Sequence, residues 1–185
     1  MSLGAYGWVG VINLASCGGW LVAYALGLLI WLPPSRSARW AVRLTLLCAV
    51  GFLVIAAVPI DPGLGYPPGV PAVHTAVGYL HQVGAIGLFA AGLLASALLG
   101  RCVGAMRAGL IVAGVMAVSF AVACVLVTLS VTGVLEGTPS GLFERVTLST
   151  GLGWIGLVGL RLWSRRAKIA KCSGSSPVSS GYSSS

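Results

Sequence analysis

The stretch AGLIVAGVMAVSFAVACVLVTLSVTGVL, residues 108–135, contains no Lys, Arg, Asp or Glu and decides the fold. A transmembrane helix needs about 20 residues to cross ~30 Å of hydrocarbon at a rise of ~1.5 Å per residue. This stretch is therefore long enough to span a bilayer. Similar uncharged runs cover residues 1–35, 44–60, 62–100 and 146–160. The sequence thus predicts five membrane spans.

The run 146–160 is the shortest of the five, because as a helix it would cover only about 22 Å. We predict that it spans the bilayer because the long side chain of Arg161 can reach toward the headgroups. At the other boundary, Arg145 would lie beside Glu144.

Composition supports the same class of protein. Of the 185 residues, 57% are apolar and 8% are charged, against roughly 45–50% and about 25% in soluble domains. This composition excludes a water-soluble enzyme, a disordered chain and a disulfide-rich secreted domain. We predict an all-α polytopic transmembrane bundle in a single domain over residues 1–166, followed by a basic and then Ser-rich disordered tail over 167–185.

Prolines mark the ends of the predicted helices. Pro33-Pro34 ends the first helix and Asp61-Pro62 the second, because proline cannot continue the hydrogen-bond ladder. Thr138-Pro139 has the pattern of a cap followed by Pro at the first helical position. The predicted spans are about 6–32, 40–60, 73–100, 107–132 and 142–164.

The basic residues predict the orientation. Ten of the eleven Lys and Arg flank the first and third connections and the C-terminus, which lie on one side of an alternating bundle. The positive-inside rule makes that side cytoplasmic and the N-terminus external. We therefore expect a multi-pass plasma-membrane protein with no nucleic-acid partner. The groups expected on the outer side are Asp61, His74, His81, Glu136, Glu144 and Arg145.

Small residues recur at every fourth position in three of the spans. Such stripes let helices approach closely within lipid. We expect these stripes to pack the helices of the bundle against one another. The alternative is that they pack against a second copy of the chain, forming a homo-oligomer, or against another membrane protein. The lipid bilayer itself is also an expected partner. The stripes are Ala15-Gly19-Ala23-Gly27, Gly87-Ala91-Ala95 and Gly109-Ala113-Ala117-Ala121.

Residues 58–81, VPIDPGLGYPPGVPAVHTAVGYLH, contain most of the groups capable of chemistry. His74 and His81 are seven residues apart, or about 10.5 Å along a helix. That spacing excludes a shared metal ion unless the helix breaks, for which Gly78 is the candidate. Asp61 or Glu144 could instead partner a histidine. Such a cluster could bind a small ligand, or it could bind a metal ion with Asp61 and His81 as candidate metal ligands. It could also relay protons or act as a general acid and base.

Structural roles compete with these functional ones. Asp61 can cap its turn, and His74 can simply be solvated at a helix start. Glu144 and Arg145 can form a boundary ion pair or complement a helix dipole. His81 lies inside the apolar boundary, where an ionisable group is a functional hypothesis by default.

Four blocks of the chain resemble an uncharacterised prokaryotic membrane family, domain of unknown function 998. They are GAYGWVGVINLASCGGWLVAYALGL, PIDPGLGYPPG, HTAVGYLH and GLFERVTLSTGLGWIGLVGLRLW. The resemblance covers about residues 3–165, and DPGLGYPPG is its most specific part. It implies a helical membrane protein with six spans, of which this chain would carry the last five. It implies no activity or catalytic residues.

Three functions remain open at this point. The first is non-enzymatic binding of a small ligand, lipid headgroup, ion or proton at the outer cluster of Asp61, His74, His81, Glu144 and Arg145. The second is a membrane-embedded hydrolase that uses His and Asp, with or without a metal ion. Against it, no Ser or Cys nucleophile lies beside a histidine in a local motif. The third is a structural or partner-assembling subunit. No cofactor is predicted.

Overall fold

The computed structural model describes residues 6–63, 69–71, 73–135 and 138–173, with side chains up to Lys168 in the last segment. Helices in these residues are α1 (Gly7–Trp31), α2 (Arg36–Ala57), α3 (Ala76–Cys102), α4 (Met106–Val131) and α5 (Ser140–Ser173). All five are long and apolar enough to cross a membrane. The predicted all-α bundle of five spans is confirmed.

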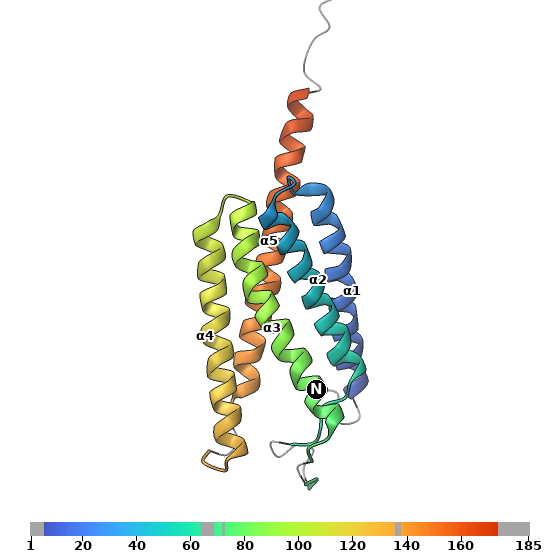
Figure 1. Cartoon of the computed structure of the whole chain (residues 1–185), viewed down its shortest axis with the longest axis vertical. Coiled ribbons are helices and arrows are strands. Elements are labelled where there is room, and N and C mark those ends of the chain that lie inside the picture. Colours follow the sequence, from blue (N-terminus) through green and yellow to red (C-terminus); the bar gives the residue numbers. More distant parts are fainter. Residues whose placement is uncertain (1–5, 64–68, 72, 136–137, 174–185) are drawn as a thin grey trace, which may run out of the picture.

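The helices run alternately up and down (Figure 1). Each packs against the next along the chain, and α5 also contacts α3. The α1–α2 and α3–α4 connections therefore share one end of the bundle, from which α5 projects; we call it the basic end. The α2–α3 and α4–α5 connections share the opposite end, which we call the histidine end.

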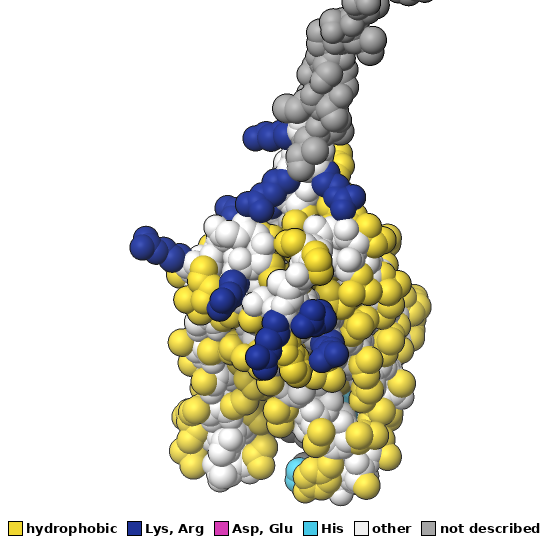
Figure 2. All heavy atoms as spheres, turned by 45° about the horizontal axis from the view of Figure 1, so that its top comes forward, with side chains coloured by type: hydrophobic (Ala, Val, Ile, Leu, Met, Phe, Trp, Pro, Cys, Tyr) yellow, Lys and Arg dark blue, Asp and Glu magenta, His cyan; other side chains and the backbone are white. Residues whose placement is uncertain are grey.

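The charged side chains are segregated between these two ends. Figure 2 shows Lys and Arg side chains gathered over the basic end. They come from the start of α2, the α3–α4 connection and the C-terminal part of α5. The bundle therefore has the charge asymmetry that the sequence predicts, and the assignment of the basic end to the cytoplasm stays a prediction.

The bounds of α2 differ from the predicted 40–60. The helix begins at Arg36 because the Ser35 hydroxyl oxygen accepts the backbone N–H of Ala38 at 3.1 Å and caps the first turn. It ends at Ala57 because Val58 takes an extended backbone (φ −102°, ψ 113°), as the residue before a proline usually does. Pro59, rather than Pro62, therefore ends the second span.

The observed bounds of α3 and α5 also differ from the predicted ones. α3 begins at Ala76, after the cap Thr75, rather than at 73. The Thr138 hydroxyl donates to the Leu126 carbonyl of α4 at 3.4 Å, which ties α5 to α4 and differs from the expected capping role. α5 continues to Ser173, well beyond the predicted 164, so the basic segment after the span is helical.

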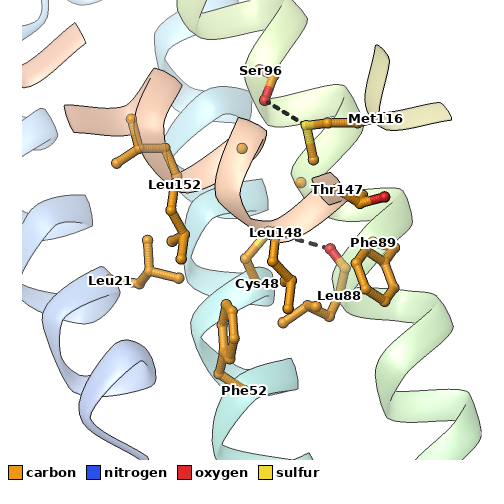
Figure 3. A pocket seen from close by; sticks show the side chains of 13 residues that line it. Leu21, Cys48, Phe52, Leu88, Phe89, Ser96, Met116, Thr147, Leu148 and Leu152 are labelled. Carbon is orange, nitrogen blue, oxygen red and sulfur yellow. Dashed lines mark hydrogen bonds between the residues drawn. The ribbon is translucent and has the colours of Figure 1, made fainter. Parts of the chain in front are cut away.

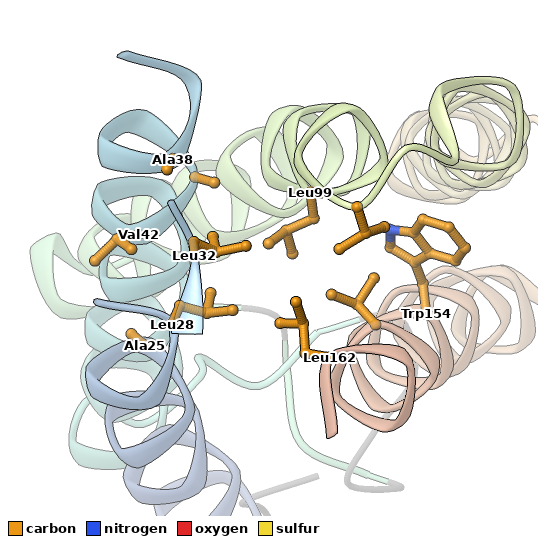
Figure 4. Close-up of a cluster of buried hydrophobic side chains, with 11 residues drawn as sticks. Ala25, Leu28, Leu32, Ala38, Val42, Leu99, Trp154 and Leu162 are labelled. Carbon is orange, nitrogen blue, oxygen red and sulfur yellow. The ribbon is translucent and has the colours of Figure 1, made fainter. Parts of the chain in front are cut away.

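The core lies between the helices at two levels. A cluster in the basic half joins α1, α2, α3 and α5 through Ala25, Leu28, Val42, Leu99 and Trp154, among others (Figure 4). A second cluster nearer the middle includes Leu21, Phe52, Leu88 and Phe89. The Trp154 indole N–H donates to the Ser96 carbonyl at 3.1 Å, which fixes α5 against α3.

Two small-residue stripes have different environments. A Cβ added to Gly109 would lie 2.9 Å from the Gly100 Cα and 2.8 Å from the Ser96 carbonyl oxygen, so the backbones of α3 and α4 touch there. By contrast, a Cβ on Gly19 or Gly27 of α1 would meet nothing within 4 Å. The α4 stripe therefore packs inside the bundle at Gly109, whereas the α1 stripe is open at both of its glycines.

Candidate functional site

Asp61 ties the α2–α3 connection to the start of α3. Its carboxylate accepts the Thr75 backbone N–H at 2.6 Å and the Thr75 hydroxyl at 2.7 Å. These hydrogen bonds, the backbone one foremost, lower the pKa of Asp61 below its ordinary value. A Cβ on Gly78 would overlap this carboxylate, so glycine is needed for the close approach. Asp61 also carries its charge at the positive end of the α3 dipole.

The two histidines have separate positions. His74 is exposed in the connection before α3, where its charge acts on Asp61. His81 is half-buried within α3, which runs unbroken from Ala76. Gly78 therefore does not break the helix, and the fold does not bend α3 to bring the two imidazoles together.

His81 links α3 to the end of α2. Its Nδ1 lies 2.7 Å from the Val58 carbonyl oxygen. Because a carbonyl can only accept, Nδ1 carries a proton and donates it in this bond. Nε2 is then the ring nitrogen that can take a proton or a hydrogen bond from a ligand.

Glu144 of α5, which is exposed, and His81 of α3, which is half-buried, both lie at the histidine end of the bundle. Glu144 precedes the buried residues Thr147 and Gly151 by three and seven positions on α5, and that spacing keeps them on one helix face. His81 precedes the buried Leu88 by seven positions on α3. The structure thus places His81 and Glu144 at the same end of the bundle, on α3 and α5.

Arg145 occupies another side of α5. Adjacent helix residues do not face each other, and Arg145 is exposed next to the exposed Val146. Like Glu144 it is exposed, but it does not share the helix face of Thr147 and Gly151. Glu136, also expected at this end, lies outside the described residues.

An apolar crevice lies between the helices, with Leu88 of α3 and Thr147 of α5 in its wall. The space that it encloses is small, about 30 Å³, and one side is open. Figure 3 shows Leu21 of α1 and Leu152 of α5 on the same side of it. Leu152 is exposed, so the crevice opens sideways there. All five helices contribute to its wall, including Leu21, Phe52, Leu88, Met116, Gly151 and Leu152.

Polar groups in the crevice wall bond to the protein rather than to the space. The Cys48 thiol donates to the Leu88 carbonyl at 3.6 Å, and the Thr147 hydroxyl donates to the Phe143 carbonyl at 2.9 Å. The Ser96 hydroxyl donates to the Met116 sulfur at 3.6 Å. The crevice therefore presents apolar atoms to whatever fills it.

Two features of the bundle could not be found from sequence patterns. The crevice depends on all five helices coming together, which no local periodicity encodes. Tyr24 lies within an apolar run of α1, yet its buried hydroxyl has no hydrogen-bond partner among the described residues. The approach of the Gly159 position on α5 to the Tyr24 ring accounts for this burial.

The described residues contain no group of three His, Cys, Asp or Glu side chains placed to hold a metal ion. Both carboxylate oxygens of Asp61 take hydrogen bonds from Thr75. The geometry therefore favours His81 and Glu144, rather than Asp61 and His81, as the groups available to a ligand.

A family model described as "Protein of unknown function (DUF998)" matches residues 1–161. The match covers α1 to α4 and α5 as far as Arg161, and so includes both His81 and Glu144. No curated protein and no solved structure matches the chain.

Proposed function

The chain belongs to the DUF998 family, and we propose that this multi-pass membrane protein binds an amphiphile at its histidine end. The polar head would lie between His81 and Glu144, and the hydrocarbon chain would enter the apolar crevice. This role needs no covalent chemistry.

The observation that supports this proposal most is the alignment of the polar pair with the crevice. Thr147, in the crevice wall, is about 4.5 Å from Glu144 along α5. Leu88, on the opposite wall, is about 10.5 Å from His81 along α3. A ligand at this point meets polar groups at one end and an apolar surface at the other.

The polar pair also favours one class of head group. The Glu144 carboxylate accepts hydrogen bonds, and Nε2 of neutral His81 does the same. A head that donates, such as a primary ammonium or a hydroxyl, complements both groups. An ammonium would additionally gain attraction to the carboxylate.

We further propose that this protein resides in the plasma membrane with the histidine end outside. The support is the concentration of Lys and Arg at the opposite end, together with the positive-inside rule. The amphiphile would then be taken from the outer leaflet or its aqueous surface.

Thermal unfolding of the purified protein in an uncharged detergent tests the proposed function. Decylamine and decanoic acid have chains of equal length and opposite head charge at neutral pH. We expect decylamine to raise the unfolding temperature of the wild type, because a ligand that binds the folded state stabilises it, and decanoic acid to leave it unchanged.

Two substitutions on adjacent residues supply the control. Glu144→Gln should abolish the response to decylamine, whereas Arg145→Gln, at a position that does not share the helix face of Thr147, should preserve it. Equal responses to both amphiphiles, or an unchanged response in Glu144→Gln, would contradict the proposal.

A partner-assembling subunit is the second candidate, supported by the open stripe on α1. Gly19 and Gly27 have no neighbour within 4 Å of an added Cβ. If a second copy packs on this stripe, Gly19→Leu should convert a dimer to a monomer in light scattering from detergent solution. Gly153→Leu, at an equally open glycine of α5, should leave the mass unchanged. A monomeric wild type would eliminate the self-association form of this candidate.

A further inference from the structure

Three arginines line one face of α2 at the basic end. Arg36, Arg39 and Arg43 follow the i, i+3, i+7 spacing that keeps side chains on the same side of a helix. All three are exposed. We call this group the arginine face.

The side chains of the arginine face converge toward one level of the membrane. Arg43 lies about 10.5 Å deeper along α2 than Arg36. Helical side chains lean toward the N-terminus, and the Arg43 guanidinium lies over the Trp40 ring, 5.3 Å from its centroid. Its charge is therefore drawn back toward Arg39. Tryptophans near helix ends are typical of the headgroup level.

No described residue supplies an anion to this face. Among the described residues, the carboxylates are those of Asp61 and Glu144, both at the histidine end. Two other arginines at the basic end, Arg165 and Arg166, have acceptors within the protein. Arg165 donates to the Val103 carbonyl at 2.9 Å, and Arg166 donates to the Ile30 carbonyl at 2.8 Å.

The same face of α2 continues into the bilayer as an apolar surface. Leu47 and Val50 follow Arg43 by four and seven residues, and both are exposed. The face therefore presents cations at the headgroup level and apolar side chains below them. An anionic phospholipid has its phosphate and its acyl chains at the same two levels.

We propose that the arginine face binds the phosphate of an anionic phospholipid, whose acyl chains lie along Leu47 and Val50. Guanidinium groups match phosphate oxygens in pairs of parallel hydrogen bonds. The apolar continuation favours a lipid over free phosphate. This inference is independent of the amphiphile site, which lies at the other end of the bundle.

Native mass spectrometry of the intact protein tests the proposal. Phosphatidylglycerol and phosphatidylcholine with identical chains are titrated into the detergent-purified protein, and bound lipids are counted. The wild type should retain phosphatidylglycerol in preference. Each basic residue near a membrane surface contributes about fivefold to the affinity for anionic lipid. The triple variant Arg36→Gln, Arg39→Gln, Arg43→Gln should therefore lose at least about tenfold in phosphatidylglycerol affinity.

A variant with the same change in net charge is the matched control. Arg101→Gln, Arg107→Gln, Arg161→Gln should lose clearly less affinity than the arginine-face variant. Arg43→Lys keeps the charge and the fold but removes the planar fork, and it should also weaken phosphatidylglycerol binding. Equal losses in the two triple variants, or unchanged binding in both arginine-face variants, would overturn the proposal.

Inorganic phosphate distinguishes the source of the anion. Millimolar phosphate should leave bound phosphatidylglycerol in place if the acyl chains contribute as proposed. Complete displacement by phosphate alone would show an anion site without lipid character and would contradict the proposal. Equal retention of phosphatidylcholine would do the same.

Discussion

Asp61 holds the start of α3 through two hydrogen bonds from Thr75. Thr75 in turn accepts the Gly78 backbone N–H at 3.1 Å through its hydroxyl oxygen. Three residues thus fix the geometry of the histidine end, because His81 lies one turn further along the same helix. At the residue scale, the site depends on this clamp rather than on Asp61 as a ligand.

Gly78→Ala should destabilise the protein by about 1–3 kcal/mol, because the added Cβ overlaps the Asp61 carboxylate. Gly87→Ala on the same helix is the control, since a Cβ there meets nothing within 4 Å and helix propensity favours Ala by up to about 1 kcal/mol. Thermal unfolding in uncharged detergent compares the two. Equal stability of both variants would contradict the clamp.

Acid should weaken the clamp in a defined pH range. Because hydrogen bonds from Thr75 lower the pKa of folded Asp61, their stabilisation is complete above the unfolded value of about 3.9 and is lost as pH falls through the folded value. The unfolding temperature of the wild type should therefore drop below about pH 4 by more than that of Asp61→Asn. Parallel pH profiles for the two proteins would exclude this role.

The α3–α4 pair is the clearest case at the scale of elements. A Cβ on Gly109 would press on backbone atoms of α3, and backbone cannot rotate away as a side chain can. The two helices are therefore held as close as glycine allows, with Gly100 on the facing helix. This contact positions α3, and with it His81, relative to α4 and α5.

Gly109→Ala should cost about 1–3 kcal/mol of stability, the usual range for overpacking. Gly114→Ala, also on α4, has open space for its Cβ and should be neutral or stabilising. Denaturant titration in mixed micelles measures both changes. If Gly109→Ala unfolds no earlier than Gly114→Ala, the close helix contact is wrong.

The helices themselves were predictable because apolar runs between charges fix the number of spans. The ends of the helices were less predictable from the sequence. Ser35 begins α2 by capping it, and Val58 ends it because Pro59 follows, which are local effects that a count of charges overlooks. The extension of α5 to Ser173 carries it beyond the apolar run that predicted it.

At the scale of the whole molecule, the candidate site was only partly predictable. The sequence singled out His81, since an ionisable group inside an apolar run stands out, and it placed Glu144 at the membrane boundary on the same side. It offered Asp61 or Glu144 as the partner of a histidine but could not choose between them, because their positions depend on how α3 and α5 pack. The crevice was not predictable at all, since its wall is assembled from side chains of all five helices.

The two ends of the bundle carry opposite chemistry, and the function proposed here requires them to face opposite sides of the membrane. Single cysteines placed at Val70 in the histidine end and at Pro34 in the basic end, in a chain whose native cysteines are replaced, test this directly. Both positions are exposed. With a membrane-impermeant maleimide, intact cells should label Val70→Cys at once and Pro34→Cys only after permeabilisation. Labelling of Pro34→Cys in intact cells, with Val70→Cys protected, would contradict the account.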